Sequence, residues 1–182
     1  MRRLALLLAV ALATASCSDA EPESAAPAAF AAAGSELPEG YTEARCPGGE
    51  GSGMTAEFAV PPGYTAYDGD ACDFARGYDG ELYVTVGPED SLADHKERQV
   101  DPFEDQGGDD SVSDISYADD VPAFGDRRGE RLEYYCYCDG QELDYRIVQA
   151  HGVRLTWVTE HGKQAAHEPA YDAVTASMAL VG

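Results

Sequence analysis

Positive charge is scarce in this sequence. Lysine and arginine together number 12, against 34 aspartate and glutamate residues, so the formal net charge is −22. The only lysines are Lys96 and Lys163. Such a negative surface repels the phosphates of nucleic acids and an anionic membrane surface. We therefore expect no nucleic-acid partner; the charge favours solubility, or alternatively the binding of a cation or a basic partner.

Long apolar segments are lacking as well. The most apolar run, Leu4 to Ala13, is ten residues long, whereas a membrane-spanning helix needs about 20. The run follows Arg2 and Arg3 and precedes the small residues 14–16. This pattern is typical of an export signal that is removed on maturation. We expect an exported protein that keeps no transmembrane helix.

Cys17 stands directly after these small residues. A basic start, a short apolar run and a cysteine behind small residues resemble the lipobox of bacterial lipoproteins, with Thr14 where leucine is usual. The resemblance implies that the thiol of Cys17 is acylated and becomes the new N-terminus, outside the cytoplasm. Acyl chains would hold the protein at the cell membrane, because each buried CH₂ contributes about 0.8 kcal/mol. Alternatively, a secretory signal is cut near Ala13 or Ala15 and Cys17 remains an ordinary thiol.

The chain divides into three parts on this interpretation. Residues 1–16 are the lipoprotein signal peptide. Residues 17–45 begin with the acylated cysteine and are rich in Ala, Pro, Glu and Ser, a composition that cannot offset the entropy of ordering and predicts a flexible tether. Residues 46–182 are long enough for a single globular domain with one hydrophobic core.

Within the domain, alternating apolar and polar residues predict strands over residues 57–60, 72–75, 81–86 and 112–118. Residues 91–101 are predicted to form a short helix. Ser91 can cap that helix with Asp94 three residues on, and Pro102 ends it. Residues 107–110 are predicted to form a loop.

The clearest pattern is a meander in the second half of the domain. Asp139 and Gly140 are typical of a two-residue hairpin turn. Closing this turn pairs Cys138 with Gln141, Cys136 with Leu143, Tyr134 with Tyr145 and Leu132 with Ile147. A similar turn at His151 and Gly152 would place Val153, Leu155 and Trp157 opposite Ala150, Val148 and Arg146, on the other face. Either that loop holds three residues with a bulge, or both faces of the sheet are covered.

The last predicted element is a helix with Pro169 in its first turn. Its apolar face combines Tyr171, Val174, Met178 and Val181, which recur at helical spacing.

Three segments carry a family resemblance: Phe58 to Tyr64, the meander from Arg131 to Thr159, and Ala170 to Met178. Their order resembles the Mog1/PsbP-like fold found in small bacterial lipoproteins, including the LpqN-type group. The resemblance implies an α+β class, with an antiparallel sheet and flanking helices in an α/β/α sandwich. It implies no catalytic residues.

Four further cysteines remain: Cys46, Cys72, Cys136 and Cys138. An even number in an exported protein predicts two disulfides. Cys136 and Cys138 lie two residues apart on one strand, roughly 7 Å between α-carbons, which exceeds the usual span of about 4.4–6.8 Å. We therefore expect each to bond with Cys46 or Cys72, in either combination. A zinc or copper(I) site and free or redox-active thiols are the alternatives.

Motifs for catalysis are absent from the sequence. Residues 51–53 lack the spacing of a Gly-x-Ser-x-Gly elbow, and the four histidines form no His-Glu-x-x-His pattern. We expect no catalytic residue, cofactor or metal. Acidic residues are dense from Asp101 to Asp120, but their spacing differs from a calcium-binding EF-hand loop. A solvated acidic loop is the simpler interpretation.

Tyr135 and Tyr137 alternate with Tyr134 and Tyr145 and are predicted to project from the opposite sheet face. If both faces of the sheet are covered, the rings of Tyr135 and Tyr137 pack in the core. If no helix covers that face, Tyr135 and Tyr137 would form a patch for a partner protein or a small amphiphile. We therefore expect a non-enzymatic binding module on a lipid anchor. An envelope enzyme or enzyme accessory with an acidic and histidine site, or a metal- or lipid-handling protein, is the alternative.

Overall fold

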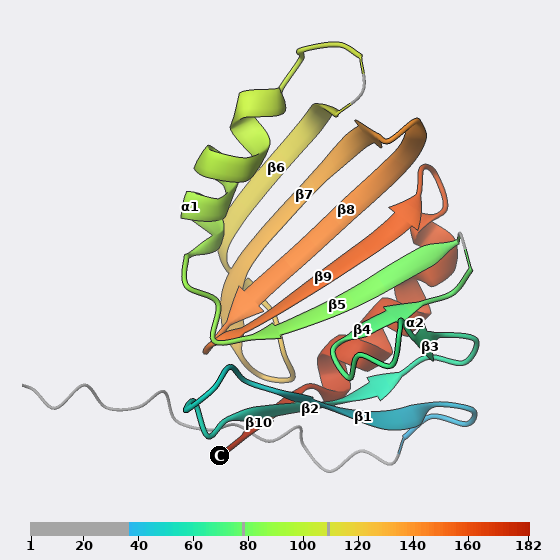
Figure 1. Cartoon of the computed structure of the whole chain (residues 1–182), viewed down its shortest axis with the longest axis vertical. Coiled ribbons are helices and arrows are strands. Elements are labelled where there is room, and N and C mark those ends of the chain that lie inside the picture. Colours follow the sequence, from blue (N-terminus) through green and yellow to red (C-terminus); the bar gives the residue numbers. More distant parts are fainter. Residues whose placement is uncertain (1–36, 78, 109) are drawn as a thin grey trace, which may run out of the picture.

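The computed structural model describes residues 37–77, 79–108 and 110–182 (Figure 1). The predicted signal, Cys17 and residues 18–36 of the predicted tether lie outside this part. The strands are β1 (Thr42–Pro47), β2 (Thr55–Val60), β3 (Thr65–Ala66), β4 (Asp73–Ala75), β5 (Gly80–Val86), β6 (Ser111–Pro122), β7 (Arg128–Cys138), β8 (Gln141–Ala150), β9 (Val153–Glu160) and β10 (Ala179–Val181). The helical segments are α1 (Leu92–His95), the π-helical turn η1 (Lys96–Val100), the 3₁₀ turn η2 (Asp101–Phe103) and α2 (Gln164–Ser177). No helix in the described part is long and apolar enough to cross a membrane.

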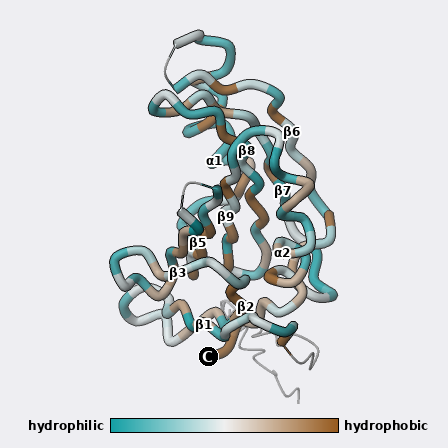
Figure 2. The backbone as a smooth tube through the Cα atoms, turned by 90° about the vertical axis from the view of Figure 1, so that its right-hand side faces the viewer, coloured by the Kyte–Doolittle hydropathy of each residue, from teal (hydrophilic) through white to brown (hydrophobic). Residues whose placement is uncertain are grey.

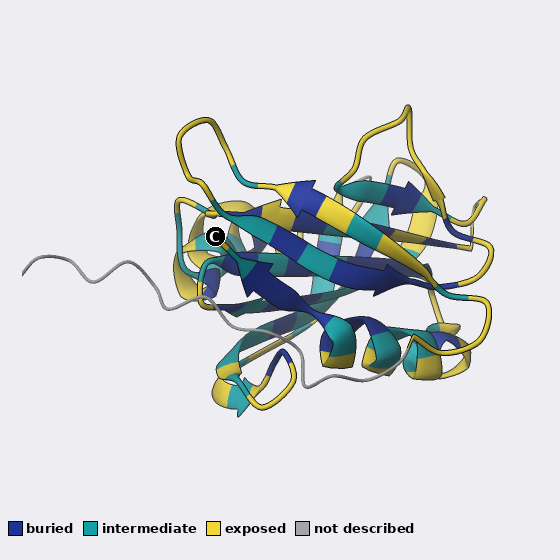
Figure 3. Cartoon of the chain, turned by 90° about the horizontal axis from the view of Figure 1, so that it is seen from below, coloured by how far each residue is buried: buried dark blue, intermediate teal, exposed yellow. Residues whose placement is uncertain are grey.

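The strands form two antiparallel sheets, so the domain belongs to the α+β class. The large sheet has the order β3-β4-β5-β9-β8-β7-β6, and the small sheet has the order β1-β2-β10. Helices α1 and α2 lie on opposite faces of the large sheet (Figure 2). Buried and exposed residues alternate along the strands (Figure 3), as in β5, where the even-numbered positions from Gly80 to Val86 are buried.

The predicted meander is confirmed residue by residue. The turn at Asp139 and Gly140 sets all four predicted pairs, including Tyr134 opposite Tyr145. The turn at His151 and Gly152 holds two residues, so that Val153 pairs with Ala150 and Leu155 with Val148. Of the two alternatives left open by the alternating pattern, the structure has the second: each face of the sheet carries a buried cluster, with Val148 in one and Ile147 in the other, although the α1 face is covered only in part.

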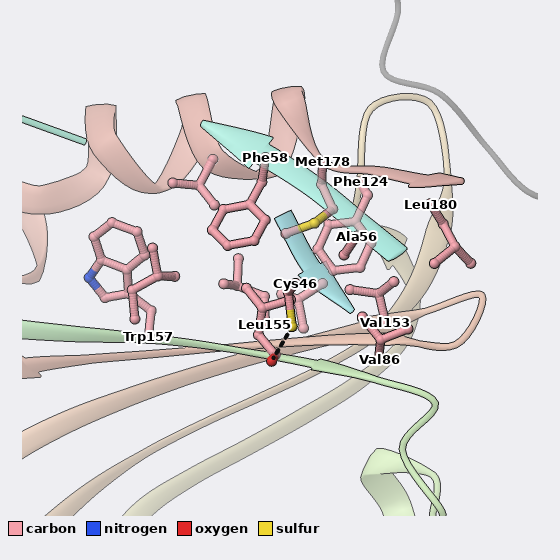
Figure 4. Packing of buried hydrophobic residues seen from close by; sticks show 14 of the residues in the cluster. Cys46, Ala56, Phe58, Val86, Phe124, Val153, Leu155, Trp157, Met178 and Leu180 are labelled. Carbon is pink, nitrogen blue, oxygen red and sulfur yellow. Dashed lines mark hydrogen bonds between the residues drawn. The ribbon is translucent and has the colours of Figure 1, made fainter. Parts of the chain in front are cut away.

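The main core fills the space between the large sheet, the small sheet and α2 (Figure 4). Phe58 of β2 meets Phe74 of β4 edge-on, with ring centroids 5.8 Å apart. The Oγ of Ser177 accepts a hydrogen bond of 2.9 Å from the backbone N–H of Ala59 and so attaches the end of α2 to β2. This face of the large sheet is called the α2 face below.

A second, smaller cluster lies on the opposite face, called the α1 face. It consists of Leu92, Val100, Val112, Leu132, Cys136 and Ile147. Ser91 caps α1 as predicted, because its Oγ accepts the N–H of Asp94 at 3.1 Å. Just before the cap, Asp90 accepts a hydrogen bond of 2.7 Å from Arg154 of β9. This bond holds the pKa of Asp90 below its ordinary value and fastens the α1 segment to the sheet.

Two predicted boundaries differ from the structure. Strand β1 begins at Thr42, four residues before the predicted domain start at Cys46, because it pairs with β2 along its whole length. Helix α2 begins at Gln164, so Pro169 lies inside the helix rather than in its first turn. It ends at Ser177, and Val181 belongs to β10, which pairs with β2. Helical spacing over residues 178–181 is overridden by a strand partner far away in the sequence.

The disulfide pairing predicted from strand geometry is wrong. Cys46 is bonded to Cys72, and Cys136 to Cys138, with α-carbons 4.8 and 5.4 Å apart respectively. The first pair packs with the main core and the second with the α1-face cluster, so the large sheet stands between them. The cross-pairing is therefore impossible, and the chain contracts enough at the end of β7 for the neighbouring bond.

Candidate functional site

Tyrosines from three strands share the α1 face of the large sheet. Tyr134 of β7 pairs with Tyr145 of β8, and Tyr83 of β5 pairs with Thr156 of β9. Leu92 and Val100, from α1 and η1, pack over the β6–β8 side of this face. In Figure 1, α1 lies to one side and leaves β8, β9 and β5 in view. This helical cover is too short for the sheet, so the tyrosines stay only partly buried.

Tyr134 and Tyr145 are stacked, with centroids 4.7 Å apart and ring planes 8° from parallel. Burial raises the pKa of both hydroxyls, so both rings remain neutral at physiological pH. The hydroxyl of Tyr83 donates a hydrogen bond to Glu81. The pKa of Tyr83 is raised as well, mainly by burial and secondly by this hydrogen bond. Tyr134 and Tyr145 form a neutral aromatic wall, and Tyr83 shares this face of the sheet without lining the hollows beside that wall.

Two adjoining hollows run along this wall and share Tyr145 and Cys138; together they are called the tyrosine cleft. One has a volume of about 200 Å³ and is lined among others by Gln99, Phe103, Val112, Tyr134 and Cys136. The other has a volume of about 380 Å³ at the hairpin end of the sheet and includes Tyr67, Glu81, Asp139, Leu143 and Glu160. Phe103, on η2, keeps 41% of its surface exposed.

The lining of the tyrosine cleft is acidic. Asp110, Glu81, Asp139 and Glu160 line it, and no lysine or arginine belongs to its lining among the described residues. Glu160 is partly neutralised by Lys163 at 2.5 Å. The nearby cations Lys96 and Arg98 are already paired with Asp101 and Asp90. The cleft therefore offers aromatic surface at a negative potential, which attracts cations.

The predicted patch residues lie on the other face. Tyr135 and Tyr137 alternate with Tyr134 and Cys136 along β7 and so project toward the α2 face. The ring of Tyr135 packs edge-on against His161, with centroids 4.8 Å apart. Neither tyrosine lines the tyrosine cleft. All four tyrosines are half-buried, so exposure does not separate the two pairs. Tyr134 and Tyr145 differ because they pack against the α1-face cluster and line the hollows, which alternation alone could not show.

Acidic and histidine side chains do meet on the α2 face. Nδ1 of His161 lies 2.8 Å from Oδ1 of Asp144, whose Oδ2 accepts the N–H of Gly162 at 2.9 Å. The bond to Asp144 raises the pKa of His161. Nearby, Arg146 bonds to Glu133 and Glu168 at 2.6 and 2.8 Å. These pairs attach α2 and the β9–α2 turn to the sheet.

The space beside these pairs is small. The cavity between Asp144, Arg146, Trp157 and α2 has a volume of about 10 Å³, room for one water molecule. A shallow hollow of about 240 Å³ lies on the outer side of His161. Within the described residues, no three His, Cys, Asp or Glu side chains gather so that they could hold a metal ion. The four cysteines, divided between two faces, cannot share one metal.

The chain matches no protein-family model, and its sequence matches no curated protein.

Proposed function

We propose that this protein is an extracytoplasmic lipoprotein that is anchored through Cys17 and binds a partner in the tyrosine cleft without catalysing a reaction. The order of elements, with a sheet between helices on opposite faces, supports assigning the domain to the Mog1/PsbP-like sandwiches. The observation that carries the binding role is the incompletely covered α1 face. Partly exposed aromatic rings beside a cleft of several hundred Å³ are typical of a recognition surface.

The partner is a basic segment of another exported protein. Its lysine or arginine stems would lie on the faces of Tyr134 and Tyr145, while the charged heads reach Asp139 and Glu81. Cation–π attraction and coverage of the aliphatic stems stabilise such an arrangement. An anionic amphiphile would be repelled by the same carboxylates.

The anchor is tested by Cys17→Ala in the native host. The variant is expected in the buffer-soluble fraction and the wild type in the membrane fraction, because only the acyl chains hold the protein at the lipid. The acylated N-terminal peptide should be detected by mass spectrometry of the wild type alone. A variant that still sediments with membranes would disprove the anchor.

The cleft is tested with charge variants that preserve the backbone. Asp139 has a φ of 51° in the hairpin turn, a conformation that asparagine tolerates, so we choose D139N together with E81Q. The matched control removes two charges elsewhere, with D126N and E43Q on exposed side chains. Binding of a lysine- and arginine-rich peptide, measured by calorimetry at 50 mM salt, should weaken about tenfold in the cleft variant. Equal weakening of binding in the cleft variant and the control would show that the peptide is held by non-specific charge attraction.

Photocrosslinking from position 103 in the intact envelope identifies the natural occupant. Phe103 lines the tyrosine cleft and is exposed, so a crosslinking side chain there should capture an exported protein through a peptide rich in lysine or arginine. The matched control carries the same crosslinking side chain at position 103 in a cleft variant with D139N and E81Q, which should capture less of that exported protein. Capture of lipid, or of an acidic protein, would overturn the assignment of the partner.

A further inference from the structure

The two disulfides of this domain differ in what they constrain. Cys46 and Cys72 are 26 residues apart and join β1 to the segment before β4. Cys136 and Cys138 are two residues apart on one strand, and β7 is already paired there with both β6 and β8. A bond between neighbours closes the smallest loop and restricts the unfolded chain least. The Cys136–Cys138 bond therefore contributes little to holding the fold.

The two sulfur atoms of this bond also differ in access. Cys136 is 2% exposed within the α1-face cluster. Cys138 lies at the end of β7, is half-buried, and lines both hollows of the tyrosine cleft. Cys136 lines one hollow as well but is almost fully buried, so a thiol that enters the cleft reaches the Sγ of Cys138 first. Disulfides that are exposed and structurally dispensable are the ones that exchange with thiols.

We propose that the Cys136–Cys138 disulfide is redox-active and oxidises a dithiol carried by a peptide or protein at the tyrosine cleft. This proposal does not rest on the binding function proposed above. A substrate thiolate attacks the Sγ of Cys138, and the bond to Cys136 breaks. Cys136 leaves with the electron pair and takes up the proton that the first thiol released. The second substrate thiolate then attacks the substrate sulfur of the mixed disulfide, and Cys138 leaves and is protonated. Two electrons and two protons pass from the dithiol to the cysteine pair.

The charge around Cys138 selects among thiols. Asp139 follows it directly, and Asp110 and Glu81 line the same cleft. Carboxylates repel an anionic thiol and attract a cationic one. The substrate class is therefore a dithiol on a neutral or basic segment, and small acidic thiols are poor reductants of this bond.

Trypsin separates the two disulfides cleanly. Residues 46–76 contain Cys46 and Cys72, and residues 132–146 contain Cys136 and Cys138, each bounded by arginines. The full-length protein is incubated in graded dithiothreitol buffers, alkylated, digested and mapped by mass spectrometry. The 132–146 peptide should become alkylated at a dithiothreitol concentration at least about tenfold lower than the 46–76 peptide. Equal sensitivity, greater resistance of peptide 132–146, or its alkylation before any reductant is added would overturn the proposal.

Two further measurements test the direction of attack and the charge selection. In C136S the remaining Cys138 should form a mixed disulfide with cystamine, whereas Cys136 in C138S should stay unmodified; equal reaction of both would overturn the proposed attack on Cys138. In the wild type, cysteamine should reduce the 132–146 bond about fivefold faster than mercaptoethanesulfonate, after each rate is divided by its rate with a free model disulfide. A ratio of one would overturn the charge selection.

Discussion

Other elements of the domain cover the two faces of the large sheet to different extents. On the α2 face, a second sheet and a 14-residue helix enclose the main core, and a disulfide joins segments 26 residues apart. On the α1 face, a four-residue helix and two short turns cover only one side, and the disulfide is local. The first face holds the domain together. The second keeps aromatic side chains partly exposed, and such surface is where a partner or substrate can bind.

The largest expected difference comes from matched leucines. Leu155 on the α2 face and Leu92 on the α1 face are both 0% exposed. Leu155→Ala should lower the free energy of unfolding by about 4 kcal/mol, and Leu92→Ala by about 2 kcal/mol, because a site beside an open cleft can collapse around the lost methyl groups. Urea unfolding measures both. An equal or larger loss for Leu92→Ala would show that the α1 face is as tightly packed as the other.

Removal of each disulfide sharpens the same comparison. Replacing Cys46 and Cys72 together by alanine should cost about 3 kcal/mol, the chain-entropy value for a loop of this order of length. Replacing Cys136 and Cys138 together should cost no more than about 1.5 kcal/mol, since the loop they close is minimal. The midpoints of urea unfolding under non-reducing conditions measure the difference. A larger loss of stability on removing Cys136 and Cys138 would mean that this local bond stabilises the fold more than the bond between Cys46 and Cys72.

The smallest effect concerns the attachment of the α1 segment at low pH. The folded-state pKa of Asp90 is depressed by its bond to Arg154, so this group stabilises the fold above its unfolded pKa of about 4. Its contribution is lost as the pH falls through the folded pKa. Asp90→Asn should therefore be less stable than the wild type at pH 7 and nearly equal to it at the lowest pH at which both still fold. Thermal unfolding of both proteins across this pH range measures the difference in stability. D126N, at an exposed position, is the control.

Much of the meander was predictable because its signals are local. A two-residue turn at Asp139 and Gly140 determines the register of everything that follows, and alternation then assigns each side chain to a face. The same local logic found the strand before Pro61, β5 and the cap at Ser91. It failed for Val181, whose strand partner is β2, and for Cys136, whose distance to Cys138 depends on how the end of β7 contracts.

The sequence predicted the general character of the candidate site but not the residues that line it. Tyrosine density on one hairpin indicated an aromatic surface, and the net charge indicated acidic surroundings. Alternation could not show whether Tyr135 with Tyr137 or Tyr134 with Tyr145 lines a cleft, because a period of two assigns residues to two faces without showing where other elements leave hollows. Tyr134 and Tyr145 pack against the buried α1-face cluster, and the short helical cover of that face leaves the two hollows beside them.

The sequence by itself determined the acidic character, the even set of domain cysteines, the hairpin register and the division of residues between two sheet faces, because composition and local turn chemistry are properties of the chain. Only the tertiary structure decided which cysteines are bonded and which tyrosines line the cleft. Both depend on where separate elements meet across the sheet: a sheet separates side chains that are neighbours in sequence, such as Ile147 and Val148, and brings Cys46 to Cys72.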